Sequence, residues 1–249
     1  MVERIFKTYF SNEQLSWVMA GGVFLIIAII LQFSRFQRYS LFALVLGAFA
    51  INFFSALLDP FVNMWDERFH ALVAKNMLEN PFIPMLYTEN PVEIDNSFWS
   101  MGHIWLHKQP LFLWQIALSF KIFGINEIAL RLPNIIMCSL LIYPLFQLGR
   151  ILVNERTGFM TSFLFITSFY FGELVAGWQL LDHNDIAFLF YTTLSIWAWV
   201  EYTEREKKSW ILLAGLFSGL AILNKWLVGL LVFAGWITMI LTNKNLRSN

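Results

Sequence analysis

The stretch LPNIIMCSLLIYPLFQLG, residues 132–149, holds 18 residues without a single charge. A helix needs about 20 predominantly apolar residues to cross a bilayer, so this stretch predicts a membrane-spanning helix. Six further stretches have a similar character, at about 15–33, 41–58, 157–174, 186–202, 209–223 and 227–242. We therefore expect an all-α integral membrane protein. It would be a polytopic helical bundle of about seven spans, with residues 1–249 forming one transmembrane domain.

The composition of the whole chain also indicates the bilayer as its solvent. Hydrophobic residues make up 58% and charged residues 14%, with a mean hydropathy of +0.60. These values exclude a disordered chain, and the single cysteine, Cys138, excludes a disulfide scaffold. The 17 basic residues balance the 17 acidic ones, so a basic nucleic-acid-binding protein is excluded and no nucleic-acid partner is expected.

The short loops indicate the orientation, because Lys and Arg collect on the cytoplasmic side of a membrane. With the N-terminus outside, the inner loops hold nine basic residues and the short outer segments hold three: Arg35, Arg38, Arg150, Arg156, Arg205, Lys207, Lys208, Lys244 and Arg247 against Arg4, Lys7 and Lys225. The long segment 59–130 then lies outside. Together with the second outer loop it carries 11 of the 17 acidic residues and all four histidines. We expect a basic inner face and an acidic outer face.

Two amphipathic helices are predicted within the outer segment 59–130. The first, about Asp66 to Asn80, has apolar residues at helical spacing and is stopped by Pro81. The second, Pro110 to Phe123, begins at a proline and ends before a glycine. With a rise of 1.5 Å per residue it is only about 21 Å long, so we expect it to lie on the outer membrane surface. Residues 81–107 are interpreted as loop.

Two motifs of this outer segment carry candidate chemistry. In WDERFH (65–70), Asp66 opens the first helix, where free N–H groups stabilise a carboxylate. Asp66 could therefore be a general base toward a hydroxyl, or simply a helix cap. In HKQP (107–110), Lys108 could bind a phosphate as a point charge, or extend to the lipid headgroups.

Two further motifs lie where the chain meets the membrane on the same side. LDHND (181–185) places Asp182 and Asp185 directly before an apolar span. Carboxylates there are costly unless they face a polar cavity, and the alternative is an exposed loop above the bilayer. NKW (224–226) holds Lys225, which is either a functional cation or an interfacial anchor. Together the four motifs predict a polar cleft at the outer membrane surface.

A metal site is the weaker interpretation of the histidines. His103 and His107 are four residues apart, which suits one face of a helix, and His183 with nearby carboxylates could add ligands. Gly102 and Pro110 argue against a helix at this place. We therefore expect no metal, while a divalent ion is left open.

The motifs resemble those of the polyprenyl-phosphate-dependent glycosyltransferases of GT-C fold. More closely, they are similar to the dolichyl-phosphate-mannose–protein mannosyltransferase family and its bacterial relative, the lipid A aminoarabinose transferase. The matching stretches are WDE (65–67), HALVAKNML (70–78), HKQPL (107–111), FGINE (123–127), RLPN (131–134), the stretch 182–185 and GLAILNK (219–225). The pattern Gly-x-Asn-Glu-x-Ala-x-Arg-Leu-Pro, residues 124–133, is the most specific. The stretch 15–33 resembles an added N-terminal helix.

The resemblance implies roles for the candidate residues. Asp66, with its neighbour Glu67, would be catalytic, and Asp66 would be the base that takes the proton of the acceptor. Lys108 would bind the lipid phosphate that leaves, with Lys225 or Arg68 assisting.

The remaining candidates would complete the cleft. Asp185 or Asp182 would be its second acidic residue, and His70, His107 and His183 would support the site. Some positions depart from the family pattern: Lys-Pro-Pro becomes KQP at 108–110, and Thr-Lys-Gly becomes NKW at 224–226.

By this resemblance we expect an inverting glycosyltransferase. It would move a sugar from a polyprenyl-phosphate donor to a hydroxyl acceptor on a protein, lipid or glycan, with no required cofactor. It would lie in the cell membrane, with the bacterial inner membrane favoured and the active face periplasmic or extracellular. The alternatives are a membrane transporter, against which the scarcity of charges within the spans argues, and a truncated, non-catalytic family member. Relatives carry more spans, so the chain is expected to be truncated, and a second half or partner subunit would complete the lipid groove.

Overall fold

The computed structural model describes residues 9–87, 102–178 and 182–242. Within these ranges the regular structure is helical, and the only β pairing is an isolated antiparallel bridge between Met85 and Ile104. The elements in chain order are α2 (Asn12–Gln32), η1 (Gln37–Tyr39), α3 (Ser40–Ala56), α4 (Asp66–Asn76), α5 (Pro110–Phe123), α6 (Glu127–Leu140), α7 (Ile142–Leu152), α8 (Glu155–Ile166), α9 (Phe169–Ala176), α10 (Asp185–Arg205), α11 (Lys208–Lys225), η2 (Trp226–Leu230) and α12 (Leu231–Thr242).

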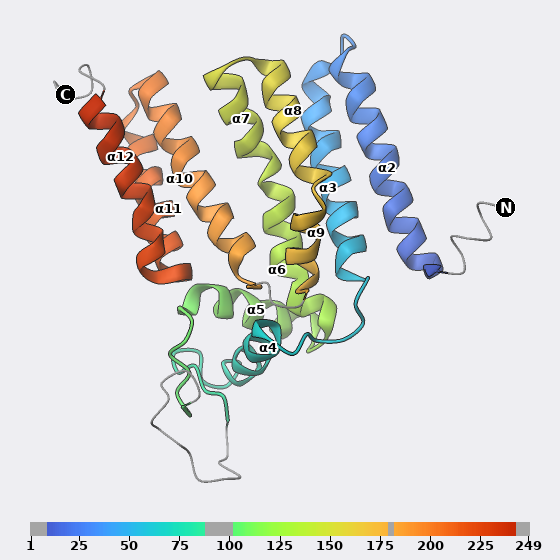
Figure 1. Cartoon of the computed structure of the whole chain (residues 1–249), viewed down its shortest axis with the longest axis vertical. Coiled ribbons are helices and arrows are strands. Elements are labelled where there is room, and N and C mark those ends of the chain that lie inside the picture. The colour runs from blue at the N-terminus through green and yellow to red at the C-terminus, as the bar shows by residue number, and fades with distance from the viewer. Residues whose placement is uncertain (1–8, 88–101, 179–181, 243–249) are drawn as a thin grey trace.

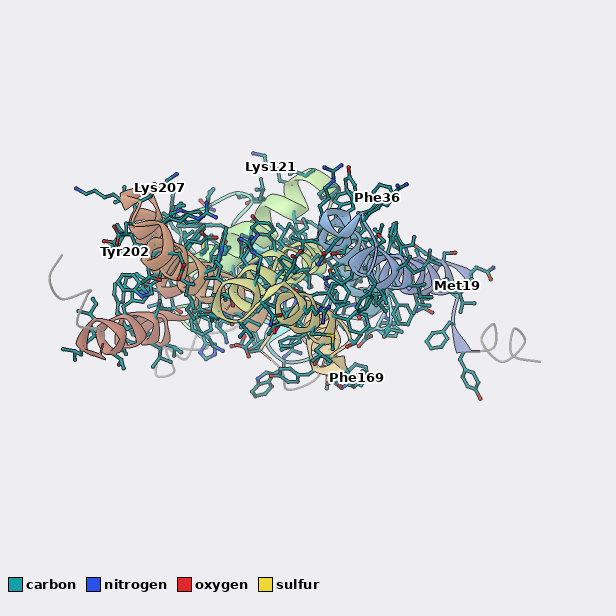
Figure 2. All side chains as sticks on the ribbon, turned by 90° about the horizontal axis from the view of Figure 1, so that it is seen from above. Met19, Phe36, Lys121, Phe169, Tyr202 and Lys207 are labelled. Atoms are coloured by element: carbon teal, nitrogen blue, oxygen red, sulfur yellow. The ribbon has the colours of Figure 1, made fainter. Side chains whose placement is uncertain are left out.

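The long helices form a row, and two shorter helices lie across one end of it. Figure 1 shows α2, α3, α6–α7, α8–α9 and α10–α12 side by side, with α4 and α5 crossing below them. Seen from above in Figure 2, the row is elongated, with Met19 of α2 near one end and Tyr202 of α10 near the other. Lys121 of α5 and Phe169 of α9 lie on opposite faces of this row. The expected all-α architecture is confirmed.

Within the part of the chain that the structure describes, four helical stretches are long and apolar enough to cross a membrane: Asn12–Gln32, Gln37–Ala56, Glu127–Leu152 and Lys208–Thr238. The bent pair α8–α9 would make a fifth. Every one of the seven stretches expected from the sequence overlaps one of these helices or α10. The chain is thus a multi-pass membrane protein, while the number of crossings stays a prediction.

The stretch 157–174 was expected as one span, but the structure breaks it. α8 ends at Ile166, α9 starts at Phe169, and the two are bent by 50°. Between them, the Thr167 hydroxyl donates hydrogen bonds to the carbonyl oxygens of Phe163, at 3.1 Å, and Leu164, at 3.3 Å. Such bonds from a side chain to the preceding turn bend helices, which gives a local reason for the break.

The first helix of the outer segment is shorter than expected. It was predicted to reach Asn80, but α4 ends at Asn76. The buried Asn76 amide donates hydrogen bonds to the carbonyl oxygens of Met85, at 2.9 Å, and Leu86, at 3.1 Å. The loop thus folds back on the helix end, and hydrogen-bonded turns continue the chain from α4 to Asn80, directly before Pro81.

The second helix has the predicted bounds, Pro110–Phe123, and is fastened to α6. Pro133 inside α6 has no N–H, so the carbonyl of Ala129 lacks its usual helical donor. The Ser119 hydroxyl of α5 donates to that carbonyl at 2.6 Å. α5 buries Phe112 and Ile116 in the core and leaves other apolar side chains, such as Leu118, exposed. Burial of each core side chain contributes about 1.5–3 kcal/mol, which holds α5 across the bundle end.

Candidate active site

Asp66 is the first residue of α4 and lies in contact with the lysine that precedes α5. Trp65 occupies the N-cap position, so Asp66 is not itself the cap that the sequence left as an alternative. Its carboxylate accepts a hydrogen bond from Lys108 Nζ at 3.1 Å. The same Lys108 Nζ donates to Asp182 at 2.7 Å. One lysine therefore bridges two carboxylates that come from distant parts of the chain.

A second lysine continues this arrangement. Lys225, the last residue of α11, lies 3.3 Å from the Asp182 carboxylate and forms an ion pair with Asp185 at the start of α10. The five alternating charges Asp66, Lys108, Asp182, Lys225 and Asp185 are called the charge chain below. Their side chains are between 11% and 31% exposed. They gather at the end of the bundle that α4 and α5 cross, as Figure 1 shows for their helices.

The two carboxylates that share Lys108 titrate in opposite directions. Burial raises the pKa of Asp66 above its ordinary value of 3.8, because desolvation outweighs the attraction of Lys108 and the neighbouring Asp182 anion adds to the rise. Asp182 is also buried, but Lys108 and Lys225 together outweigh that burial and lower its pKa. Carboxyl groups whose environments separate their pKa values are typical of acid–base sites. Asp182 stays an anion, and Asp66 is the better proton acceptor.

Glu67, the neighbour of Asp66, points into a different environment. It is 1% exposed and accepts hydrogen bonds from Arg131 of α6, at 2.7 Å from Nε and 3.1 Å from Nη2. The backbone N–H of Asn63 donates to Glu67 at 2.8 Å. Arg131 also donates to the carbonyl oxygens of Ala56 and Phe61. Together with Glu67 it forms what we call the arginine node, which fastens the start of the outer segment to α6.

Arg68, which was expected to assist at the phosphate, is exposed and lies over the ring of Phe69, with 5.2 Å from Cζ to the ring centroid. Among the described residues it makes no contact with the charge chain. The contacts of Arg131 instead explain the motif at 124–133, whose arginine the sequence did not single out as part of the site. An arginine opening an apolar span was the available signal, because such a charge needs a partner.

Two of the expected supporting histidines lie buried beside the charge chain. His70 and His183 are both 0% exposed, and their rings stack at 5.8 Å between centroids. Burial lowers the pKa of each, and that of His70 falls well below its ordinary value of 6.5. Both imidazoles are thus expected to be neutral. Burial and the adjacent Lys108 also lower the pKa of His107.

The structure gives no support to a histidine metal site within the parts of the chain it describes. Over those residues, no group of three or more His, Cys, Asp or Glu side chains is arranged to hold a metal ion. His103 lies next to the β bridge between Met85 and Ile104 and not on a helix. The four-residue spacing of His103 and His107 therefore does not place them on one face of a helix.

Comparison with known proteins places this site in a family context. The family model described as dolichyl-phosphate-mannose-protein mannosyltransferase matches residues 107–249, more than half of the chain. That range contains four members of the charge chain, from Lys108 onward. An uncharacterized protein of Aquifex aeolicus is 32% identical over 196 residues. The match covers 78% of this chain and 36% of that relative, so the chain spans about a third of the relative's length.

A solved structure has the same fold. The archaeal oligosaccharyltransferase AglB from Archaeoglobus fulgidus, solved in complex with an inhibitory peptide and a dolichol-phosphate, superimposes with a TM-score of 0.59. The sequences are 18% identical over a match that covers 80% of this chain and 25% of that one. The likeness at this identity concerns the fold, and it confirms the expected GT-C architecture.

Proposed function

Because the chain belongs to the dolichyl-phosphate-mannose-protein mannosyltransferase family, we propose that it transfers a sugar from a polyprenyl-phosphate donor to a hydroxyl acceptor with inversion at the anomeric carbon. The observation that carries the proposal is the charge chain. It brings a proton acceptor, Asp66, and two ammonium groups, those of Lys108 and Lys225, together at one end of the bundle.

The two lysines supply the charge for the donor phosphate. As the bond between the anomeric carbon and the phosphate oxygen breaks, its electrons go to the leaving polyprenyl phosphate. Lys108 and Lys225 are already fixed by carboxylates, at 2.7 Å and 3.3 Å from Asp182. Cations that are held in place before the reaction stabilise developing negative charge without reorganisation, which is where most electrostatic catalysis originates.

Asp66 supplies the base. The acceptor oxygen attacks the anomeric carbon from the side opposite to the phosphate, and its proton goes to the Asp66 carboxylate. A raised pKa makes the Asp66 carboxylate a stronger base than that of an ordinary aspartate. The carboxylates of Asp182 and Asp185 keep the two lysines in place. The second acidic position of the site therefore serves to orient the lysines.

Two of the expected roles, those of Glu67 and Arg68, change with this geometry. Glu67 acts through the arginine node and not as a catalytic group, since its carboxylate is occupied by Arg131. Arg68 has no phosphate role. His70 and His183 form a neutral wall beside the charge chain, and no metal is part of the scheme.

The site is proposed to face the outer side of the membrane, at the level of the headgroups. α5 supports this position, because it lies across the bundle end, begins two residues after Lys108 and exposes apolar side chains. An apolar pocket of about 230 Å³ lies between α5 and α6 and includes Ile122 and Ile136. Such a surface suits the apolar tail of a polyprenyl phosphate.

The test is transfer by membranes that contain the whole chain. They are supplied with radiolabelled dolichyl-phosphate mannose and with polyprenyl-phosphate pentoses, and the label is followed into protein, lipid and glycan fractions. Asp66→Asn is expected to lower the rate about 10²–10⁴-fold, the range typical for loss of a general base. The matched control is Glu79→Gln, the same carboxylate-to-amide change at an exposed residue of the outer segment. No transfer by the unaltered chain, or undiminished transfer with Asp66→Asn, would overturn the proposal.

A further inference from the structure

Two buried asparagines lie next to the charge chain and bind each other. Asn184 precedes Asp185 at the start of α10, and Asn224 precedes Lys225 at the end of α11. The Asn184 side-chain amide donates to the backbone carbonyl of Asn224, and the Asn224 amide donates to the carbonyl of Asn184, each at 3.2 Å. The two residues are 1% and 0% exposed. We call this reciprocal pair of bonds the asparagine exchange.

A third asparagine holds the same turn from another helix. The Asn134 amide of α6, which is 0% exposed, donates to the carbonyl oxygen of His183 at 2.7 Å. The turn before α10 is therefore bonded on one side to α6 and on the other to α11. All of these bonds end on backbone carbonyls, so each amide must present its nitrogen, and its orientation is fixed.

The asparagine exchange acts at the C-terminal end of α11, where the helix would otherwise fray. The last carbonyls of a helix have no donor within the helix, and the last turn frays easily. The Asn224 carbonyl is one of these, and Asn184 satisfies it. Immediately beyond Lys225 the chain leaves the helix at Trp226, which has φ 52° and ψ −132°. Lys225 is thus the final residue of a helix whose end the asparagine exchange holds in place.

We propose that Asn184 and Asn224 are positioning residues that set the end of α11 against the start of α10 and so hold Lys225 between Asp182 and Asp185. The proposal rests on the proposed function, since it assigns Lys225 to the same site. A lysine has a long, flexible stem, and its ammonium is useful to a phosphate only where its backbone is fixed. Displacement of a catalytic group by about 1 Å can cost about 10²-fold in rate.

The experiment is a double-mutant cycle between the exchange and the lysine. Asn224→Ala, Lys225→Met and the double variant are compared with the unaltered chain, with radiolabelled dolichyl-phosphate mannose as donor. Asn224→Ala is expected to lower kcat/KM about tenfold or more, mainly through kcat. In the Lys225→Met background, Asn224→Ala is expected to lower kcat/KM no more than about twofold, because the ammonium group that Asn224 positions is absent.

Asn52→Ala is the matched control. Asn52 is also a buried asparagine that joins two helices, donating to the Ser139 hydroxyl at 3.0 Å between α3 and α6. It is expected to lower the unfolding temperature without changing kcat/KM. Losses that are equal in both backgrounds, or equal for Asn224→Ala and Asn52→Ala, would overturn the proposal. Asn224→Leu, which keeps the branched shape of the side chain and removes the donor, serves if the alanine variant does not fold.

A second measurement separates this proposal from the proposed function. If the unaltered chain transfers nothing, the proposed function fails, and the same cycle is measured by thermal unfolding of the purified protein. A smaller loss of unfolding temperature for Asn224→Ala in the Lys225→Met background supports the positioning of Lys225, and additive losses reject it. If Asp66→Asn abolishes transfer while Asn224→Ala has no effect on it, the function stands and the positioning role fails.

Discussion

Asp66 and Glu67 are neighbours on one helical turn, yet they belong to two different kinds of ion pair. Glu67 is 1% exposed and Arg131 is 0% exposed, and the guanidinium is surrounded by a carboxylate and backbone carbonyls. The charge chain, in contrast, is partly open, and both of its lysines are shared between carboxylates. The arginine node is enclosed, whereas the side chains of the charge chain are partly exposed and can present their charges to a ligand.

The difference shows how burial assigns roles to chemically similar residues. A buried charge pair is held by its complete set of partners and strongly resists the loss of either one. Shared and partly exposed pairs gain less stability from each contact, and their charges can be redirected to a substrate. The arginine node is therefore expected to govern stability, and the charge chain to govern transfer.

The largest effect on stability is expected from Arg131→Met. It leaves Glu67 buried without its cation and removes the donors to the carbonyls of Ala56 and Phe61. Breaking a buried pair in this way typically costs about 3–5 kcal/mol in the free energy of unfolding. The control is Arg68→Met, one residue from Glu67 and exposed, for which we expect a change within about 0.5 kcal/mol. Unfolding in detergent measures both, and similar losses would remove the distinction between the two regions.

Lys108→Met makes a comparable change in the charge chain and is expected to act on the reaction. The donor phosphate loses one of its two cations, so transfer per folded molecule should fall about 10²–10³-fold, as for loss of one preorganised donor. The unfolding temperature should fall less than for Arg131→Met. Unchanged transfer together with a large loss of unfolding temperature would place Lys108 among the structural residues.

Gly177→Ala tests how tightly the arginine node is enclosed. Gly177 ends α9 with φ +69°, and a Cβ atom there would lie 2.5 Å from the Glu67 carboxylate. We expect a loss of about 1–3 kcal/mol in the free energy of unfolding, with transfer per folded molecule retained. Gly22→Ala, in α2 with nothing near the added methyl, should instead gain about 0.5–1 kcal/mol. Equal effects of the two changes would show that the node is not closely packed.

The smallest expected effect is a shift in the pH dependence of transfer. The reaction needs ionised Asp66, so the rate should rise with pH through a midpoint above 3.8, because burial raises the pKa of this group. Asp182→Asn removes an anion that contributes to the rise, so the midpoint should move to lower pH. A midpoint that does not move, or that moves upward, would show that Asp66 is not the group that titrates on the acid side of the pH–rate profile.

The pKa of Asp182 is lowered, whereas that of Asp66 is raised. The charged form of Asp182 therefore stabilises the folded protein. Lysines lower this pKa, so the contribution of Asp182 to stability is complete above 3.8 and is lost as the pH falls through the lowered pKa. Thermal unfolding between pH 2 and pH 5 measures this loss, which should be absent in Asp182→Asn.

Local signals in the sequence predicted local structure well. Pro110 and the glycine after Phe123 bound α5 as expected, because a missing N–H and a positive φ act within one turn. The end of α4 was placed four residues late, because the turns from Met77 to Asn80 that follow the helix are not distinguished from it by their sequence. The break at Thr167 was missed because no proline or glycine marks a hydroxyl bond to the preceding turn.

That the members of the charge chain share one side of the bundle was predictable from the sequence, whereas their pairing was not. Asp66, Lys108, Asp182 and Lys225 were assigned to one face by the alternation of spans, and the structure brings them into contact. The role of Glu67 was not predictable, because its partner lies 64 residues further along the chain. Which of the two adjacent carboxylates meets Arg131 depends on how α4 is rotated against α6, and that rotation is set by packing.

The separation of Glu67 from Arg131 also has a consequence for the order of events during synthesis. Since the two are 64 residues apart, a ribosome working at about 5–20 residues per second makes the arginine roughly 3–13 s after the glutamate. During that interval the outer segment carries an unpaired carboxylate and cannot be fastened to the bundle. Newly made chains that stall before α6 should therefore expose this segment to proteases and chaperones, which gives the cell a means to recognise an unfinished molecule.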